Sequence, residues 1–265
     1  MAPQTTIPTL HSLEHSQAHR CLWMLEELSA VDPTFKFNLK TYPRQVPYNK
    51  DLLTVFRLGK SPIMTLETTD GSPPPVIQFE PGVLTEAKSI LEFINEEYAS
   101  ERWTPASPED KRRNRFFNEF ATGTLTQKCD FTLLFEILGQ MAPWPLSWLY
   151  RVMGLPMTMR FKSDLQPVFD ILEEALSEEK PWFGGAEIGV SDFNMSWGME
   201  VAVQRGYCDL SKYAKLRNWY ERVEQRDAKR RAVERGGTMD LMWFGNKGTK
   251  FKMGELGAGE QKKDD

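Results

Sequence analysis

The feature that most constrains the fold is a change in hydrophobic periodicity about one hundred residues into the chain. Before that point, Phe35, Phe37 and Leu39 alternate with polar residues, whereas the apolar residues of Ser16–Ser29 recur at spacings of three and four. The first pattern indicates a half-buried strand and the second indicates one face of a helix. Beyond residue 109 the pattern is helical throughout. The sequence therefore predicts a mixed α/β part followed by an all-helical part.

The first part is expected to hold strands and helices in a fixed order. The expected strands are Thr5–Leu10, Phe35–Leu39, Ile63–Leu66 and Val76–Phe79, and the expected helices are Ser16–Ser29, Asp51–Phe56 and Thr85–Tyr98. Val76–Phe79 is interpreted as the hairpin partner of Ile63–Leu66, because the segment between them is rich in turn-forming residues. The order β-α-β-α-β-β-α is typical of a thioredoxin-like domain.

The second part is expected to be a bundle of long helices at Glu109–Gly139, Ser163–Ser177, Asp192–Gln204 and Lys212–Arg235, broken by Pro143, Pro145, Pro156 and the turn at 181–189. The domain prediction is a thioredoxin-like domain at 5–100, a linker at 101–108, a helical domain at 109–240 and a tail at 241–265. Much of that tail is polar, which predicts a mobile terminus.

Composition narrows the function classes. The net charge of -4 and the pI near 5.6 provide no general attraction to polyanions, which argues against nucleic acid as a partner. The three cysteines, Cys21, Cys129 and Cys208, lie far apart and form no metal-binding pattern, so no metal site is expected. The chain shows neither a secretory signal nor a long uncharged apolar segment, which predicts a soluble cytoplasmic protein.

Pro62 lies at the mouth of the expected strand Ile63–Leu66. A proline disfavours helical geometry in the residue before it, so Ser61 is expected to be extended, with its backbone N–H and C=O free to pair with another extended peptide. An ordinary turn from loop to strand is the alternative interpretation.

Several further motifs accompany the Ser61–Pro62 motif. They are His11-x-Leu13-x-x-Ser16, the helix Leu22–Leu28, the segment Leu84–Leu91, Asn114–Phe120, and Phe183–Gly185 leading to Gly189–Phe193. Over about residues 7–235 the chain resembles cytosolic glutathione transferases, most closely the fungal GTT-type subfamily. The resemblance implies a thioredoxin-like domain that binds glutathione, a helical domain that shapes a site for a hydrophobic electrophile, a cis bond before Pro62 and a homodimer.

Ser16 is the candidate catalytic residue that the resemblance implies. Lowering a thiol pKa by two units from about 8.5 takes about 2.7 kcal/mol, and one hydrogen bond to a charged group contributes about 1.5–3 kcal/mol. A hydroxyl at the start of a helix is therefore a sufficient thiolate donor. Ser16 is alternatively a helix cap, and His15 is the nearest rival for the donor role.

The resemblance also assigns glutathione-binding residues. Ser61 would pair with the cysteinyl backbone, Glu86 would meet the γ-glutamyl ammonium, and the backbone of Ala87 would meet its carboxylate. The family has a serine where this chain has Ala87, so one hydrogen bond is missing. Lys60 would reach the glycyl carboxylate, with Arg44 and Lys50 as alternatives.

The electrophile site is expected to be apolar. Its candidate lining is Phe116, Phe117, Phe120, Phe131 and Trp144–Met159. Aromatic residues on one side of a helix more often form a core, and Trp144–Met159 is alternatively a surface that contacts a membrane or a partner. Asp192 is interpreted as a helix-capping residue. Two enzymatic alternatives use the same site, namely a glutathione-dependent peroxidase and a transferase dedicated to one biosynthetic pathway. The third alternative is a non-catalytic binding or regulatory protein with the transferase fold.

Overall fold

The computed structural model describes residues 4–44, 49–141, 145–237 and 239–246, and its first part is a four-stranded mixed sheet. β1 (Thr6–Leu13) is parallel to β2 (Asn38–Tyr42) and antiparallel to β3 (Ile63–Thr68), which pairs with β4 (Val83–Thr85). The order of strands in the sheet is β2-β1-β3-β4.

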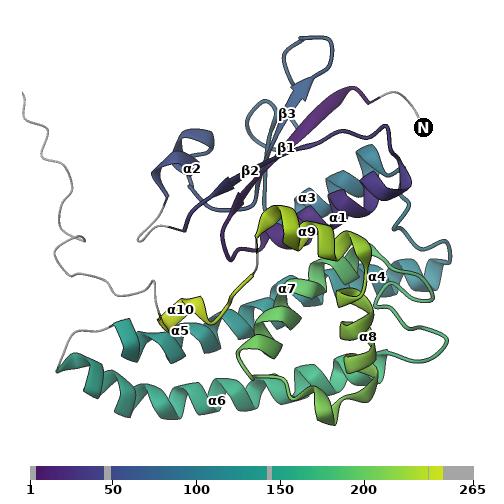
Figure 1. Ribbon diagram of the computed structural model, residues 1–265. Coiled ribbons are helices and arrows are strands. Elements are labelled where there is room, and N and C mark those ends of the chain that lie inside the picture. The colour runs from purple at the N-terminus through teal and green to yellow at the C-terminus, as the bar shows by residue number, and fades with distance from the viewer. Residues whose placement is uncertain (1–3, 45–48, 142–144, 238, 247–265) are drawn as a thin grey trace, which may run out of the picture.

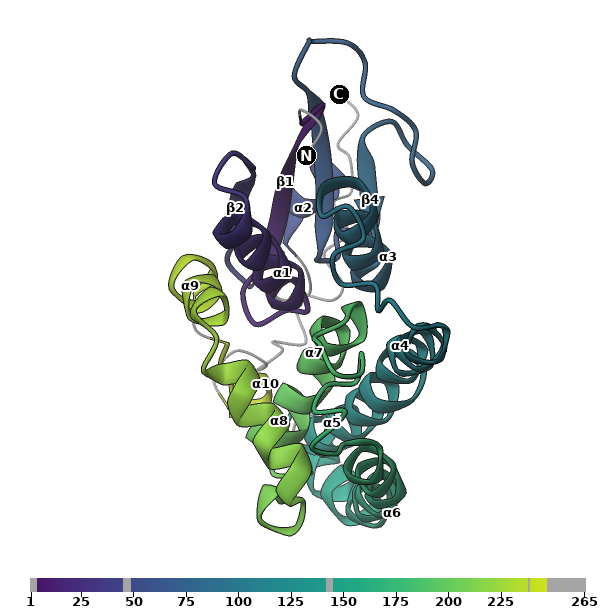
Figure 2. The same cartoon turned by 90° about the vertical axis from the view of Figure 1, so that its right-hand side faces the viewer.

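Helices cover both faces of this sheet. α1 (Ala18–Val31) and α3 (Ala87–Phe93) lie on the face toward the helical part, and α2 (Lys50–Val55) lies on the other face (Figures 1 and 2). α3 continues directly into the π-helical segment η1 (Ile94–Tyr98). The predicted thioredoxin-like arrangement is therefore confirmed.

The expected hairpin strand at Val76–Phe79 is wrong. Val76 makes only an isolated bridge with Pro81, and the side chains of Val76 and Phe79 are 62% and 68% exposed. Pro73–Pro75 come directly before this segment and have no backbone N–H to donate to a sheet. The fourth strand therefore forms only after the chain has returned to the sheet at Val83.

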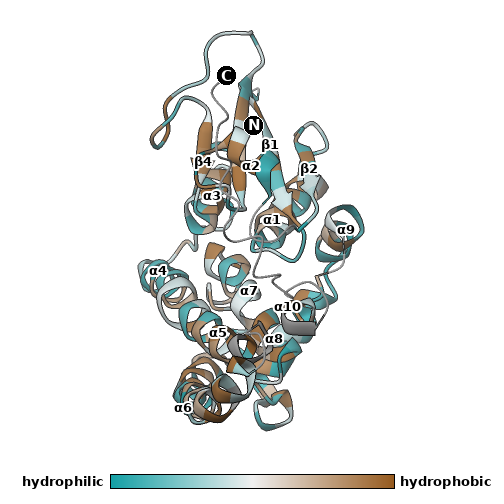
Figure 3. Cartoon of the chain, turned by 90° about the vertical axis from the view of Figure 1, so that its left-hand side faces the viewer, coloured by the Kyte–Doolittle hydropathy of each residue, from teal (hydrophilic) through white to brown (hydrophobic). Residues whose placement is uncertain are grey.

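The remaining described residues form a helical bundle, as expected. Its elements are α4 (Pro108–Phe120), η2 (Ala121–Thr126), α5 (Gln127–Met141), α6 (Leu146–Ala175), α7 (Val190–Gln204), η3 (Leu210–Lys212), α8 (Ala214–Glu224), α9 (Asp227–Gly236) and α10 (Trp243–Asn246). α5 and α6 run side by side along one edge of the bundle (Figure 1). The helices carry both hydrophobic and hydrophilic residues (Figure 3), as amphipathic helices do.

Three helix limits differ from the prediction. The expected helix Glu109–Gly139 is α4 and α5 joined by η2, and the expected helix Lys212–Arg235 is divided at Arg226, whose backbone is extended. α6 runs from Leu146 to Ala175 and contains Pro156 and Pro167. Each internal proline removes one helical hydrogen bond, and packing along α5 compensates for this loss. The expected break at Pro143 and most of the predicted tail fall outside the described residues, and the domain limits stay predictions.

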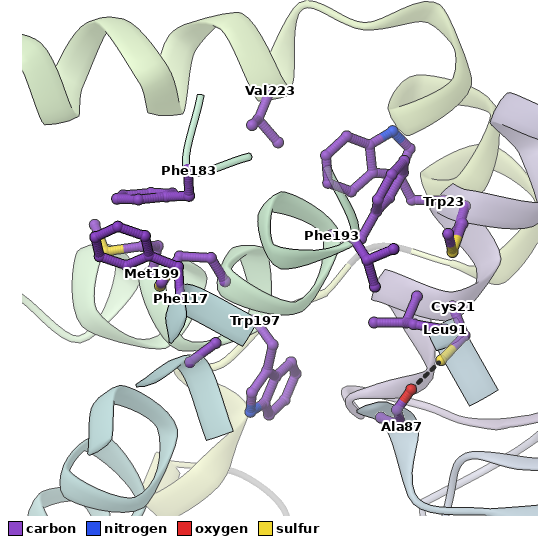
Figure 4. Packing of buried hydrophobic residues seen from close by; sticks show 14 of the residues in the cluster. Cys21, Trp23, Ala87, Leu91, Phe117, Phe183, Phe193, Trp197, Met199 and Val223 are labelled. Carbon is purple, nitrogen blue, oxygen red and sulfur yellow. Dashed lines mark hydrogen bonds between the residues drawn. The ribbon is translucent and has the colours of Figure 1, made fainter. Parts of the chain in front are cut away.

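α7 lies at the centre and connects the two parts through one core. The ring of Phe193 lies beside that of Trp23 on α1 (Figure 4), with 4.4 Å between the two ring centroids. The centroid of the Trp103 ring is 5.2 Å from that of Phe193. The buried carboxylate of Asp192 accepts hydrogen bonds from the backbone N–H groups of Phe183, Gly184 and Gly189 and from the Trp219 indole. Asp192 is thus a folding element, as the sequence indicated. The shared core fixes the start of α1 against the helical bundle.

Candidate functional site

The turn between β1 and α1 places Ser16 beside Ser61. The two Oγ atoms are 3.1 Å apart, and the Ser16 side chain is buried. Ser16 Oγ also accepts a hydrogen bond from the backbone N–H of Ala18, the first residue of α1, at 3.3 Å. Gln17 occupies the N-cap position of α1, so Ser16 lies one residue before the cap and bonds only the first N–H of the helix. The oxygen of Ser16 faces the loop before β3, and its role as thiolate donor stays a prediction.

Ser61 comes directly before β3, and the bond from Ser61 to Pro62 is cis, as the resemblance implied. Its hydroxyl oxygen accepts from the backbone N–H of Leu13 at 3.0 Å and lies 3.1 Å from the carbonyl oxygen of His11. These contacts attach the loop to the end of β1.

Glu86 and Ala87 meet at the start of α3. Glu86 is exposed and has a backbone φ of 65° with ψ of 111°, a conformation that costs free energy for a residue other than glycine. Strained residues of this kind cluster where a structure positions a ligand. Ala87 is the first residue of the helix, and its carbonyl oxygen accepts a hydrogen bond from the thiol of Cys21 (Figure 4).

These residues line two cavities that share part of their walls. The larger, about 590 Å³, is lined by Glu86 and Ala87, and the smaller, about 310 Å³, is lined by Ser16 and Ser61. Gln17, Asp130 and Leu134 line both cavities. The cavities are therefore adjacent parts of one cleft between α1, α3 and α5.

Two arginines also line the cleft. Arg20 is not among the site residues expected from the sequence, and Arg44 is expected there only as an alternative to Lys60. Arg20 lines the larger cavity and Arg44 the smaller one. Burial lowers the pKa of each guanidinium to about 10, so both stay charged at neutral pH. Arg20 donates to the side-chain and backbone oxygens of Asn194, whereas Arg44 donates to the backbone oxygens of Glu14 and His15.

Asp130 of α5 adds a carboxylate at the junction of the two cavities. Desolvation raises its pKa to about 6, while Arg20 acts to lower it. The Asp130 side chain is exposed in the cleft, so solvent water weakens this effect. No sequence pattern pointed to Asp130, because it enters the site only through the packing of α5 against α6 and α7, which sets α5 across the cleft from α1.

His15 contacts the C-terminal segment rather than Ser16. Its Nδ1 accepts a hydrogen bond from the backbone N–H of Asp240, and its ring lies 5.7 Å from that of Trp243. An accepting Nδ1 carries no hydrogen, so the ring hydrogen of a neutral His15 is on Nε2. α10 follows this segment and lies beside α5 (Figure 1), which brings Phe244 into the wall of the smaller cavity.

The apolar wall of the smaller cavity differs from the one expected. It consists of Leu133, Leu134, Ile137, Trp197, Leu241 and Phe244. Of the expected residues, Phe117 belongs to the core and Phe131 lines the larger cavity, while Trp148 and Met153 are each 65% exposed on α6. Trp144 lies outside the described residues.

Lys60 and Lys50 are exposed and are not among the described residues that line either cavity. By contrast, three buried side-chain atoms in the cleft walls have no hydrogen-bond partner within the described ranges. They are Arg20 Nε, Thr126 Oγ1 and Trp197 Nε1. Native structures usually supply a water or a ligand at such atoms.

The described part of the chain holds no cluster of residues suited to a metal ion. Within the same residues, every helix is too short or too polar to cross a bilayer.

Known proteins resemble this chain in sequence and in fold. No protein-family model matches the chain. Glutathione S-transferase 1 of Saccharomyces cerevisiae is 18% identical over 224 residues, which cover 83% of this chain and 91% of that protein.

Among solved structures, a glutathione S-transferase from Actinobacillus pleuropneumoniae superposes with a TM-score of 0.67 at 21% identity, covering 90% of this chain and 97% of its own. Ure2p5 from Phanerochaete chrysosporium, cocrystallised with 1-(S-glutathionyl)-2,4-dinitrobenzene, superposes with a TM-score of 0.63 at 18% identity, covering 88% and 95%. Together these similarities show that the chain has the glutathione transferase fold.

Proposed function

We propose that this protein is a glutathione transferase that conjugates the thiolate of glutathione to a hydrophobic electrophile. The observation that carries the proposal is the convergence, in one cleft, of Ser16, of Ser61 before a cis proline, and of Glu86 and Ala87 at the start of α3. These elements are far apart in sequence, and the fold brings them together.

Glutathione would lie along both cavities. Glu86 supplies a carboxylate for the γ-glutamyl ammonium, the first backbone N–H groups of α3 face its carboxylate, and the backbone of Ser61 pairs with the cysteinyl unit. For the glycyl carboxylate, Arg44 is better placed than Lys60, because Arg44 lines the smaller cavity while Lys60 is exposed away from it.

Ser16 would activate the thiol. A hydrogen bond from its hydroxyl stabilises the thiolate by about 1.5–3 kcal/mol, which corresponds to about one to two pKa units. The thiol proton leaves to solvent. The thiolate then forms a sulfur–carbon bond with the electrophile, and the displaced group departs with its electron pair. Leu133, Ile137 and Trp197 provide an apolar wall against which the electrophile can be held.

The finer assignments belong to the same proposal. The motifs around His11 and Trp23 favour the fungal GTT-type subfamily and a detoxifying role. The three cysteines are free and buried, which suits the reducing cytoplasm. Exposed apolar side chains on α6, including Trp148 and Met153, are suited to the interface of a homodimer.

The proposal is tested by calorimetry with glutathione at pH 7 and by turnover of 1-chloro-2,4-dinitrobenzene and of cumene hydroperoxide. Binding together with aryl halide conjugation supports a transferase. Turnover of the hydroperoxide alone would favour the peroxidase alternative. Binding without turnover of a range of electrophiles would favour a non-catalytic protein, and no binding at millimolar glutathione would refute the proposal.

A further inference from the structure

The side chain of Ser61 has more hydrogen-bonding neighbours than a loop hydroxyl usually has. Its oxygen lies 3.0 Å from the backbone nitrogen of Leu13, 3.1 Å from the carbonyl oxygen of His11 and 3.1 Å from Ser16 Oγ. A hydroxyl has one hydrogen to donate and two lone pairs that accept. The three neighbours therefore use the full capacity of Ser61.

The roles of two neighbours are fixed by their chemistry. Leu13 N–H donates to Ser61, and the His11 carbonyl oxygen accepts from it. With the hydrogen of Ser61 directed to His11, the bond between the two serines runs from Ser16 to Ser61. In this state the hydrogen of Ser16 points away from any ligand in the smaller cavity.

The second state reverses that bond. If Ser61 donates to Ser16, then Ser16 accepts from Ser61 and from the backbone N–H of Ala18, and both of its lone pairs are occupied. The Ser16 hydrogen is then free to point into the cavity that both serines line. A chain of hydrogen bonds polarises its members, so a donor that itself accepts a hydrogen bond is the stronger donor.

We propose that the Ser61 hydroxyl is a positioning residue that switches the Ser16 hydroxyl toward the bound thiolate. Ser61 acts through its side chain, separately from the backbone pairing assigned to it in the proposed function, on which this inference rests. In the free protein its hydrogen goes to His11. When glutathione binds, the negative sulfur draws the Ser16 hydrogen, and Ser61 turns its own hydrogen to Ser16.

A structural role alone is the competing explanation, since the same hydroxyl attaches the β3 loop to β1. Threonine and valine separate the two explanations, because they have nearly the same shape and only threonine keeps the hydroxyl. Both are β-branched and suit the extended conformation required before proline. Both leave the backbone of residue 61 in place.

The experiment measures two quantities for the wild type, Ser61→Thr and Ser61→Val. The first is the dissociation constant of S-methylglutathione, which has no thiol. The second is the pKa of the thiol of bound glutathione, from thiolate absorbance against pH. The affinity for S-methylglutathione reports any loss of binding caused by loosening the loop that Ser61 attaches to β1, and the thiol pKa of each protein is read at saturating glutathione. We expect a thiol pKa in Ser61→Thr close to the wild type and one raised by about 0.4–1 unit in Ser61→Val, the effect of one hydrogen bond.

Equal thiol pKa values in Ser61→Thr and Ser61→Val would overturn this proposal while leaving glutathione binding intact. If the wild type fails to bind S-methylglutathione, the proposed function fails and this proposal fails with it. Ser61→Ala is the second variant without a hydroxyl, and the same rise is required of it if Ser61→Val does not fold.

Discussion

Ala87→Ser is expected to strengthen glutathione binding, because it adds a hydroxyl at the start of α3, where the γ-glutamyl unit is proposed to bind. Ala87 is the first residue of α3, is 5% exposed and lines the larger cavity. Serine is well tolerated at a helix start, where its hydroxyl can bond to nearby polar groups. The added oxygen would lie where the γ-glutamyl carboxylate is proposed to bind.

The size of the gain follows from one hydrogen bond. A net contribution of about 0.5–1.5 kcal/mol corresponds to about two- to tenfold in the dissociation constant. The cavity is open to water, which supplies a partner for the new hydroxyl in the free protein. The substitution therefore exchanges a water contact for a ligand contact, and the gain stays within that range.

Calorimetry with two ligands tests this reasoning. S-methylglutathione should bind Ala87→Ser about two- to tenfold more tightly than the wild type, whereas S-methyl-cysteinylglycine, which lacks the γ-glutamyl unit, should show no gain. Unfolding in urea checks that both proteins are equally stable. Equal or weaker binding of S-methylglutathione by a stable Ala87→Ser protein would refute the placement of the γ-glutamyl unit.

Three further predictions concern stability and the electrophile wall. Asp192→Asn replaces one carboxylate oxygen by an NH2 group and so leaves two of four buried N–H donors without an acceptor. The free energy of unfolding, measured by urea titration, should therefore fall by about 2–5 kcal/mol, and a fall of less than about 1 kcal/mol would contradict the prediction. Burial lowers the pKa of His19 to about 4, so the folded protein favours the neutral imidazole. The stability that this preference contributes is present above about pH 6.5 and is lost as the pH falls toward 4, and the loss amounts to at most about 3 kcal/mol. His19→Gln should therefore flatten the dependence of urea midpoint on pH in that range, and an unchanged slope would contradict it. Leu133→Ala should raise KM for an aryl halide about three- to tenfold while leaving glutathione affinity unchanged, because it removes part of the apolar wall. Leu149 is exposed, so Leu149→Ala serves as the control. Equal effects of the two variants on KM would contradict the assigned wall.

The sequence predicts local structure well where one pattern dominates. The helical spacing around Leu25 correctly predicts α1, and Ser16 and Ser61 follow from motifs at element ends. The alternation around Phe37 correctly predicts that a strand follows α1, but β2 begins only at Asn38, so the predicted limits Phe35–Leu39 are too early. Local patterns fail where tertiary packing decides. Pro156 lies within α6 because the helix packs along α5, and Val76 is outside the sheet because the prolines before it hold the chain away from the edge.

The cleft residues illustrate the same limit. Asp130 is more than one hundred positions from Ser16 in the chain, and both line the smaller cavity. Their proximity depends on how α5 packs against α6 and α7, which no pattern within either segment records. The proposed choice of Arg44 over Lys60 likewise rests on which of the two side chains lines the smaller cavity.

The central claim is that Ser16 stabilises the thiolate of bound glutathione, and the most direct test is the pKa of that thiol in the wild type and in Ser16→Ala. Thiolate absorbance followed against pH gives both values at saturating glutathione. We predict a wild-type pKa at least one unit below that of free glutathione and a rise of about one to two units in Ser16→Ala. A lowered pKa that is unchanged in Ser16→Ala would contradict the claim and move the donor role to His15 or to the backbone.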